Sequence, residues 1–288
     1  MARGWLLRGL LLSGPVLWLA LANLGPLVGM ARISLLDAFP AAPDHVPSYS
    51  TASYQAFLAS PFYLGVFWRS LRFAAGTTVM SLVLTYPLAY HIARHVSPAR
   101  RIRRLLLLVA PFWTSEVVRT FGIMLLLSNR GAVNIALRWT GLIDEPLPLL
   151  YGGFSVGFGM VYVVLLSMLL PLYAALDRLP PNLLVAAADL GAGQWQRFLR
   201  VTLPMTKGGI VTGSVLVFLF SLGSFAVPAL LGGADMTLFA MTIGSFFGSA
   251  AGRWPLGAAF GMILLLAAVV LPLALAGLFR GRLAPGGA

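Results

Sequence analysis

The sequence predicts an all-α, polytopic membrane protein with six transmembrane helices, and three features support this. Hydrophobic residues make up 59% of the 288-residue chain and charged residues only 10%, which is far from the balance of a soluble domain. The mean hydropathy is +0.89. Apolar runs of about 20 residues, the length that crosses a bilayer, recur along the chain. The six runs lie at about residues 10–31, 64–92, 105–127, 151–176, 208–231 and 256–279.

The basic residues carry a net charge of +12 and predict the topology. They gather beside the apolar runs at Arg3 and Arg8, over 94–104, over 178–207 and at Arg280 and Arg282. Because this is the positive-inside pattern, we expect both termini in the cytoplasm. The loops expected outside are about 32–63, 128–150 and 232–255. No aromatic and basic patch lies beyond the membrane flanks, so the pattern indicates a lipid bilayer and no nucleic-acid partner.

The first run resembles a cleavable signal peptide as well as a membrane anchor. Arg3 and Arg8 precede it, and Ala20-Leu21-Ala22 supplies small residues of the kind found at cleavage sites. The apolar sequence continues to Met30, however, which favours a retained anchor.

The second and third runs carry ionisable residues. Arg69 opens the second run, where a snorkelling side chain at the outer interface explains it. His91 and His95 close that run, and we expect them at the interface. Glu116 and Arg119 are predicted near the middle of the third run and, three residues apart, on one face of a helix.

The fourth run is followed by a polar segment that begins with Pro180-Pro181. Proline removes a backbone donor and clashes with the preceding helical turn, so the two prolines end the fourth span. Asn182 is a plausible N-cap for a short helix that runs to about Leu190.

A turn and a second short helix complete this segment. Gly191 and Gly193 allow a sharp change of chain direction. The second helix is predicted over 194–202 and is expected to stop at Leu203-Pro204. The segment therefore reads as a helix-turn-helix against the cytoplasmic face.

This polar segment resembles the EAA loop of bacterial ABC importer permeases. The matching residues are Ala186, Ala187, Gly191, Val201, Leu203 and Pro204. The resemblance implies a type I ABC importer permease fold, with residues 1–288 forming one transmembrane permease domain. It also implies that the loop, at about 177–207, docks into an ATPase subunit, with close contact at the small residues.

Val185 departs from the family pattern, which usually has Glu there. A glutamate three residues after an Asn182 cap could reach back to the helix start, whereas valine cannot. Asp189 lies one turn further on and is expected to supply some acidity. The residues expected to couple the chain to the ATPase are therefore Val185, Ala186, Ala187, Asp189, Gly191, Val201, Leu203 and Pro204.

More of the chain, roughly residues 65–275, is similar to the first permease subunit of spermidine/putrescine-type importers. The resemblance is carried by Pro111-Phe112-Trp113-Thr114-Ser115, Val118-Arg119-Thr120, Gly131 to Asn134, Gly141-Leu142-Ile143, Leu149-Leu150-Tyr151, Tyr173-Ala174-Ala175-Leu176 and Pro228 to Gly233. It implies a bacterial inner-membrane importer for polyamines, or for a related solute such as an opine or a phosphonate. The implied partners are a second homologous permease, two ATPase subunits and an extracytoplasmic substrate-binding protein.

Residues of the third run are the expected substrate pathway. Charges within a bilayer usually face a cavity or a partner, so Glu116 either meets a cationic solute or pairs with Arg119 to fix helix packing. Neighbouring aromatic rings offer faces to an ammonium group or simply pack. The predicted set is Phe112, Trp113, Thr114, Ser115, Glu116 and Arg119.

Motifs of other classes are absent from the sequence. It has no cysteine, no HExxH spacing for a metal and no catalytic constellation, so we expect neither a metal site nor an enzyme. It also has no GxxxxGK[ST] phosphate loop, so ATP and Mg are expected on the partner ATPase and no cofactor on this chain. An ion-coupled transporter or channel is disfavoured, since no inverted repeat is visible.

Overall fold

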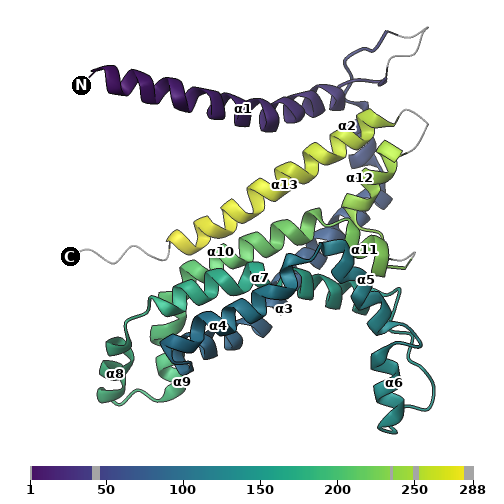
Figure 1. Cartoon of the computed structure of the whole chain (residues 1–288). Coiled ribbons are helices and arrows are strands. Elements are labelled where there is room, and N and C mark those ends of the chain that lie inside the picture. The colour runs from purple at the N-terminus through teal and green to yellow at the C-terminus, as the bar shows by residue number, and fades with distance from the viewer. Residues whose placement is uncertain (1, 41–45, 234–235, 249–252, 282–288) are drawn as a thin grey trace. The chain divides into compact units, whose positions relative to one another are not determined.

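The structure is a computed structural model that describes residues 2–40, 46–233, 236–248 and 253–281. These residues form helices and turns, together with isolated β-bridges at Leu36–Tyr49 and Phe39–Arg253 (Figure 1). In chain order the helices are α1 (Ala2–Ser34), α2 (Ala52–Ala59), α3 (Pro61–His95), α4 (Pro98–Val109), η1 (Ala110–Trp113), α5 (Glu116–Leu127), α6 (Ala132–Trp139), α7 (Gly153–Asp177), α8 (Pro181–Asp189), α9 (Gln194–Arg197), η2 (Phe198–Thr202), α10 (Leu203–Gly223), α11 (Ala226–Leu231), α12 (Phe239–Gly248) and α13 (Trp254–Gly281). The all-α class is confirmed.

Six helical segments of the described chain are long and apolar enough to cross a membrane. They are Ser13–Ser34, Pro61–His95, Glu116–Trp139, Gly153–Asp177, Gln194–Gly223 and Trp254–Ala274. Their number confirms the sequence prediction, and five of them overlap the predicted runs over most of their length. The third segment differs.

The predicted third span is interrupted at Pro111. The chain leaves the α-helix at Val109, makes the short 3₁₀-helix η1 and restarts at Glu116. Proline lacks a backbone N–H and clashes with the preceding turn, which explains the break. Ser115 then caps the new helix, accepting a hydrogen bond from Val117 N at 3.3 Å. Glu116 therefore lies in the first turn of α5, directly after the break, and not inside one continuous helix over 105–127.

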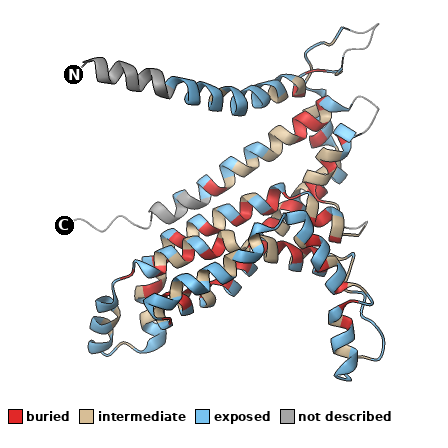
Figure 2. Cartoon of the chain, viewed as in Figure 1, coloured by how far each residue is buried: buried red, intermediate tan, exposed pale blue. Residues whose placement is uncertain are grey.

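The chain divides into two compact units, residues 1–64 with 242–270 and residues 65–241 with 271–288. The second unit is built on α7 and α10, which lie side by side (Figure 1). Its core contains Val164, Met168 and Leu172 of α7 and Val217 of α10, all fully buried. Buried residues are frequent on α3, α7 and α10, whereas α8 has none (Figure 2).

Small residues allow α7 and α10 to approach closely. A Cβ atom added at Gly209 would lie 2.6 Å from Pro171 O and 2.6 Å from Ala175 Cβ. One at Gly213 would lie 2.8 Å from Met168 Sδ. Helices in membranes associate largely by such close van der Waals packing, so these glycines set the distance between the two spans.

Asn134 organises the segment that follows α5. Its side chain is fully buried, and its Nδ2 donates hydrogen bonds to Ser128 O at 3.1 Å and Leu147 O at 3.0 Å. Leu147 N donates back to Asn134 Oδ1 at 2.8 Å. A buried amide side chain needs partners for its two N–H donors and its oxygen. These three hydrogen bonds supply them and hold α6 to the loop around it.

The first unit is held by aromatic packing. Phe260 of α13 makes edge contacts with Phe57, Tyr63 and Phe246, at centroid distances of 5.3, 4.8 and 5.3 Å. Edge-to-face geometry is the favoured arrangement of aromatic pairs. Ser34 and Tyr54 share a hydrogen bond of 2.8 Å at the end of α1.

Candidate functional site

Residues 177–207, predicted to couple the chain to an ATPase, are called the coupling segment below. Their first helix is α8, whose start differs from the prediction. Pro180 is the N-cap, with extended backbone (φ −63°, ψ 127°), and Pro181 is the first helical residue. Proline suits this position because its fixed φ fits a helix and the missing N–H would have no partner there. Asn182 is therefore inside the helix, and the prediction that it caps α8 is wrong. The predicted end near Leu190 is confirmed.

The turn after α8 depends on Gly191. This glycine has φ +82°, which disfavours any residue with a Cβ atom. Gly191 N donates to Ala188 O at 2.8 Å and Ala192 N donates to Ala187 O at 3.0 Å. These are the paired hydrogen bonds of a Schellman motif. Gly193, with φ −64°, is an ordinary N-cap of α9, so only the first of the two predicted glycines has a backbone that requires glycine.

The second short helix does not stop at Leu203-Pro204, contrary to the prediction. It continues from α9 through one turn of π-helix, η2, directly into α10. Leu203 N donates to Phe198 O, five residues back. A π turn widens the helix, so Pro204 enters without the clash that it would make in a regular α-helix. The coupling segment is thus continuous with the fifth span.

The predicted coupling residues are largely accessible. Val185, Ala186, Asp189, Gly191 and Pro204 are exposed, whereas Ala187, Val201 and Leu203 are half-buried.

Sequence reasoning missed two of the most exposed apolar residues of this segment. Leu190 is 88% exposed and Trp195 is 69% exposed, on either side of the Gly191 turn. Their signal in the sequence is large apolar side chains beside a glycine turn in an otherwise polar segment. The surface beside the Gly191 turn is therefore partly apolar.

The second candidate site is a cavity of about 660 Å³ in the second unit. Its walls come from η1, α5, α7, α10 and α11, and they are mainly apolar. The lining residues are Phe112, Glu116, Arg119, Met160, Val163, Val164, Leu166, Ser167, Leu170, Leu219, Phe220, Gly223, Ser224, Phe225 and Ala226. A large apolar cavity with a few polar groups is the usual form of a small-molecule site.

Glu116 and Arg119 do not form an ion pair in the described part of the chain, so of the two alternatives for Glu116 the structure does not show the pairing with Arg119. Arg119 instead places its guanidinium carbon 4.6 Å from the centroid of the Phe112 ring. The break at Pro111 explains this, because it places Phe112 just before the start of α5, beside Arg119. Arg119 is half-buried, and its Nε and Nη1 are buried without a hydrogen-bond partner. Glu116 is exposed at the cavity wall.

The other predicted pathway residues lie outside the cavity lining. Trp113 is 82% exposed. Thr114 donates a hydrogen bond to Pro111 O at 2.8 Å, and Ser115 caps α5, so both shape the break in the span.

Two cavity residues, Ser167 of α7 and Ser224 after α10, were missed by sequence reasoning. Ser224 Oγ is buried and has no hydrogen-bond partner among the described residues. Single hydroxyls in apolar runs are a weak signal, and they come together here only through helix packing.

Comparison with known proteins agrees with this architecture. The model of the family described as "Binding-protein-dependent transport system inner membrane component" matches residues 86–285. Two solved structures of a bacterial alginate ABC transporter, one in complex with an alginate pentasaccharide-bound periplasmic protein, have TM-scores of 0.75 and 0.76. They cover 99% of this chain and 98% of their own at 20% and 19% identity, which establishes the likeness of fold.

Similar sequences include named permeases. The spermidine/putrescine transport system permease protein PotB of Salmonella typhimurium is 37% identical over 85% of this chain and 82% of its own. The protein of the same name from Haemophilus influenzae is 36% identical over 88% of both. The inner membrane ABC transporter permease protein YdcU of Escherichia coli is 32% identical over 88% of this chain and 84% of its own. With its six apolar spans, the chain is a multi-pass inner-membrane permease of an ABC importer and belongs to the family of binding-protein-dependent transport system inner membrane components.

Proposed function

We propose that this permease imports polyamines of the spermidine and putrescine class. The observation that carries the proposal is its identity of 36–37% with spermidine/putrescine permeases along more than four fifths of both chains. The cavity is compatible with it, because its lining includes the carboxylate of Glu116 and the aromatic rings of Phe112, Phe220 and Phe225. A carboxylate and aromatic faces are the groups that bind alkylammonium ions. The cavity also holds one guanidinium, so the choice of solute rests on the relatives.

The assembly that we propose contains four subunits in addition to this chain and lies in the lipid bilayer. These are a second, homologous permease, two ATPase subunits that bind ATP and Mg, and an extracytoplasmic substrate-binding protein. The chain itself then has no catalytic role. ATP-driven closure of the ATPases moves residues 177–207, and the spans rock to open the cavity toward the cytoplasm.

The orientation in the membrane follows from charge. Basic residues flank the spans over 94–104 and 178–207, so both termini and the coupling segment lie in the cytoplasm. The segment 128–150, held together by Asn134, then faces outward and is available to the binding protein.

Transport by the reconstituted complex tests the proposal. Vesicles that contain this chain and its partner subunits should take up labelled spermidine or putrescine only when ATP is inside and the binding protein outside. An excess of unlabelled polyamine should compete, whereas an opine or a phosphonate should not. Uptake of one of those solutes without polyamine uptake would overturn the choice of substrate. If none of these solutes is taken up in an ATP-dependent way, the proposed role in import of polyamines or related solutes would be overturned.

A further inference from the structure

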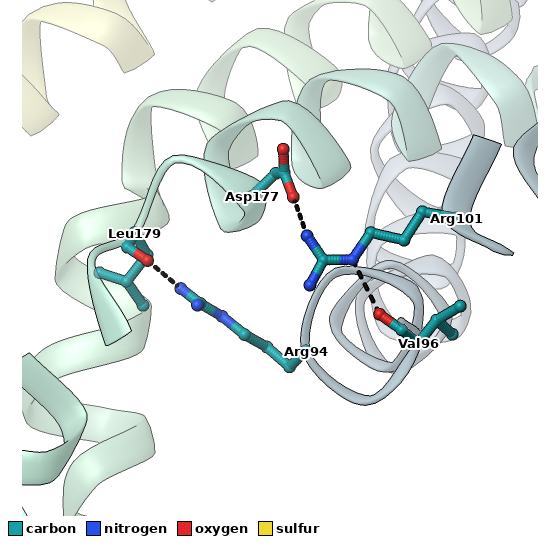
Figure 3. A network of polar contacts seen from close by, with 5 residues as sticks. All are labelled: Arg94, Val96, Arg101, Asp177 and Leu179. Atoms are coloured by element: carbon teal, nitrogen blue, oxygen red, sulfur yellow. Dashed lines mark hydrogen bonds and ion pairs between the residues drawn. The ribbon is translucent and has the colours of Figure 1, made fainter. Parts of the chain in front are cut away.

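Two arginines near the end of α3 and the start of α4 reach across to the chain that connects α7 with α8 (Figure 3). Arg94 Nη2 donates a hydrogen bond to Leu179 O at 2.6 Å. Arg101 Nη1 lies 2.7 Å from Asp177 Oδ1, in an ion pair. Arg101 Nε also donates to Val96 O at 2.9 Å. We refer to these five residues as the arginine clamp.

The clamp joins two connections that are far apart in the sequence. Val96 follows the end of α3, and Arg101 lies in the first turns of α4. Asp177 is the last residue of α7, and Leu179 precedes α8. The α3–α4 connection is therefore fastened to the point at which the fourth span gives way to the coupling segment.

Arg101 uses geometry that a lysine lacks. Arg101 presents two different nitrogens to two acceptors, one on its own connection and one on the other. A planar guanidinium holds both directions at once, whereas an ammonium group has a single nitrogen on a flexible stem. Leu179, whose carbonyl accepts from Arg94, is only 3% exposed, so that bond lies in a shielded place.

The clamp contributes more to position than to stability. The side chains of Arg101 and Asp177 are 25% and 40% exposed, and ion pairs with this much solvent contact contribute little to folding. Their removal should leave a folded chain. Without the clamp, the distance between the α3–α4 connection and the α7–α8 connection should no longer be fixed.

The clamp also lies between the two candidate sites. On one side α8 follows Leu179 and carries Ala186 and Ala187. On the other side α4 runs from the clamp to η1 and α5, which supply Phe112, Glu116 and Arg119 to the cavity. A movement of α8 would be transmitted to α7 through the covalent chain. It would be transmitted to α4 only through non-covalent contacts such as those of the clamp.

We propose that Arg94 and Arg101 are positioning residues that transmit movement of α8 to the α4–α5 wall of the cavity. The proposal rests on the proposed coupling to an ATPase. Without the clamp, α8 still docks and the ATPase still hydrolyses ATP, but the cavity wall no longer follows. Transport should then be uncoupled from hydrolysis, which a purely structural role would not produce.

The test measures solute uptake and ATP hydrolysis in the same vesicles, using the whole reconstituted complex. Arg101→Gln and Asp177→Asn should each lower the solute taken up per ATP about tenfold, as expected when a typical coupling between sites is lost. Arg101→Lys should fall between these variants and the wild type. The exchange of Arg101→Asp with Asp177→Arg should restore part of the ratio, because the ion pair is re-formed.

Arg100→Gln is the matched control. Arg100 is exposed, and its side chain makes no hydrogen bond or ion pair within the described residues, so its loss should leave the ratio unchanged. The amount of each variant in the membrane is measured by quantitative blotting. If Arg101→Gln does not accumulate there, Arg101→Lys, which keeps the positive charge, replaces it in the test. Unchanged ratios in Arg101→Lys and Asp177→Asn, or an equal fall of uptake and hydrolysis, would overturn the clamp. A wild-type complex without ATP-driven uptake would instead overturn the proposed function.

Discussion

At the scale of single residues, Glu116 and Arg119 lie in the first turns of the same helix, α5, yet they do not pair. Side chains three residues apart on one helix are close enough to interact. Here Arg119 packs on Phe112, and the Glu116 carboxylate makes no hydrogen bond or ion pair in the described part of the chain. An exposed carboxylate on a cavity wall is free to meet a solute, which removes the main objection to a pathway role.

Glu116→Gln should therefore lower polyamine uptake while the complex stays assembled. The substitution is nearly isosteric and removes a charge that would meet an ammonium group, an interaction of about 1.5–3 kcal/mol, so uptake should fall at least about tenfold. Uptake in vesicles is the measurement. Co-purification of the partner subunits with the Glu116→Gln chain controls for assembly. Normal uptake by the Glu116 variant would reject the pathway role.

Two adjacent glycines of α10 offer a second comparison at this scale. A Cβ atom at Gly209 would collide with Pro171 O and Ala175 Cβ, whereas one at Gly208 meets nothing within 4 Å. Gly209→Ala should therefore destabilise the protein by about 1–3 kcal/mol, because α10 must move away from α7. Gly208→Ala should stabilise it by about 0.5–1 kcal/mol through the ordinary helix preference for alanine. Thermal unfolding in detergent measures both, and equal transition temperatures would contradict the packing account.

At the scale of elements, the coupling segment combines one rigid turn with a continuous helix. The Schellman motif at Gly191 fixes the direction of α8, and η2 carries the chain into α10 without a break. A displacement of α9 would therefore be transmitted directly to α10, the fifth span, because no break separates the two helices. Leu190 and Trp195 are exposed beside the turn, where the proposed ATPase partner could contact them.

The turn can be tested with matched serine substitutions. Gly191→Ser forces a Cβ atom into a left-handed conformation at a cost of about 1–2 kcal/mol, so the turn should re-form differently and α8 should lose its direction. Co-purification of the ATPase subunit should fall about tenfold. Gly193→Ser introduces the same side chain at an ordinary N-cap, where serine is favoured, and should bind as the wild type does. Equal binding by the two variants would count against a coupling role for the turn.

At the scale of the whole molecule, hydropathy predicted the spans but not their interruptions. A window of about 20 residues averages over Pro111, so the run at 105–127 reads as one helix although the chain breaks within it. Pro204 predicts a helix stop from the sequence, yet proline also fits the first turn of a helix, and the π turn before it makes that possible. Ser167 and Ser224 join Glu116 at the cavity only through the packing of α7 and α10, which no local pattern reveals.

The orientation of the whole chain in the bilayer gives the last prediction, and the lack of cysteine makes it direct to test. Gln196 of α9 and Leu142 of the segment after α6 are both exposed, and positive-inside charge places the first in the cytoplasm and the second outside. In intact cells a membrane-impermeant maleimide should label Leu142→Cys and leave Gln196→Cys unlabelled. Opening the membrane should expose Gln196→Cys as well, which controls for its reactivity. Because the coupling segment reaches a cytoplasmic ATPase only from the inner side, labelling of Gln196→Cys in intact cells would overturn the topology and the docking role together.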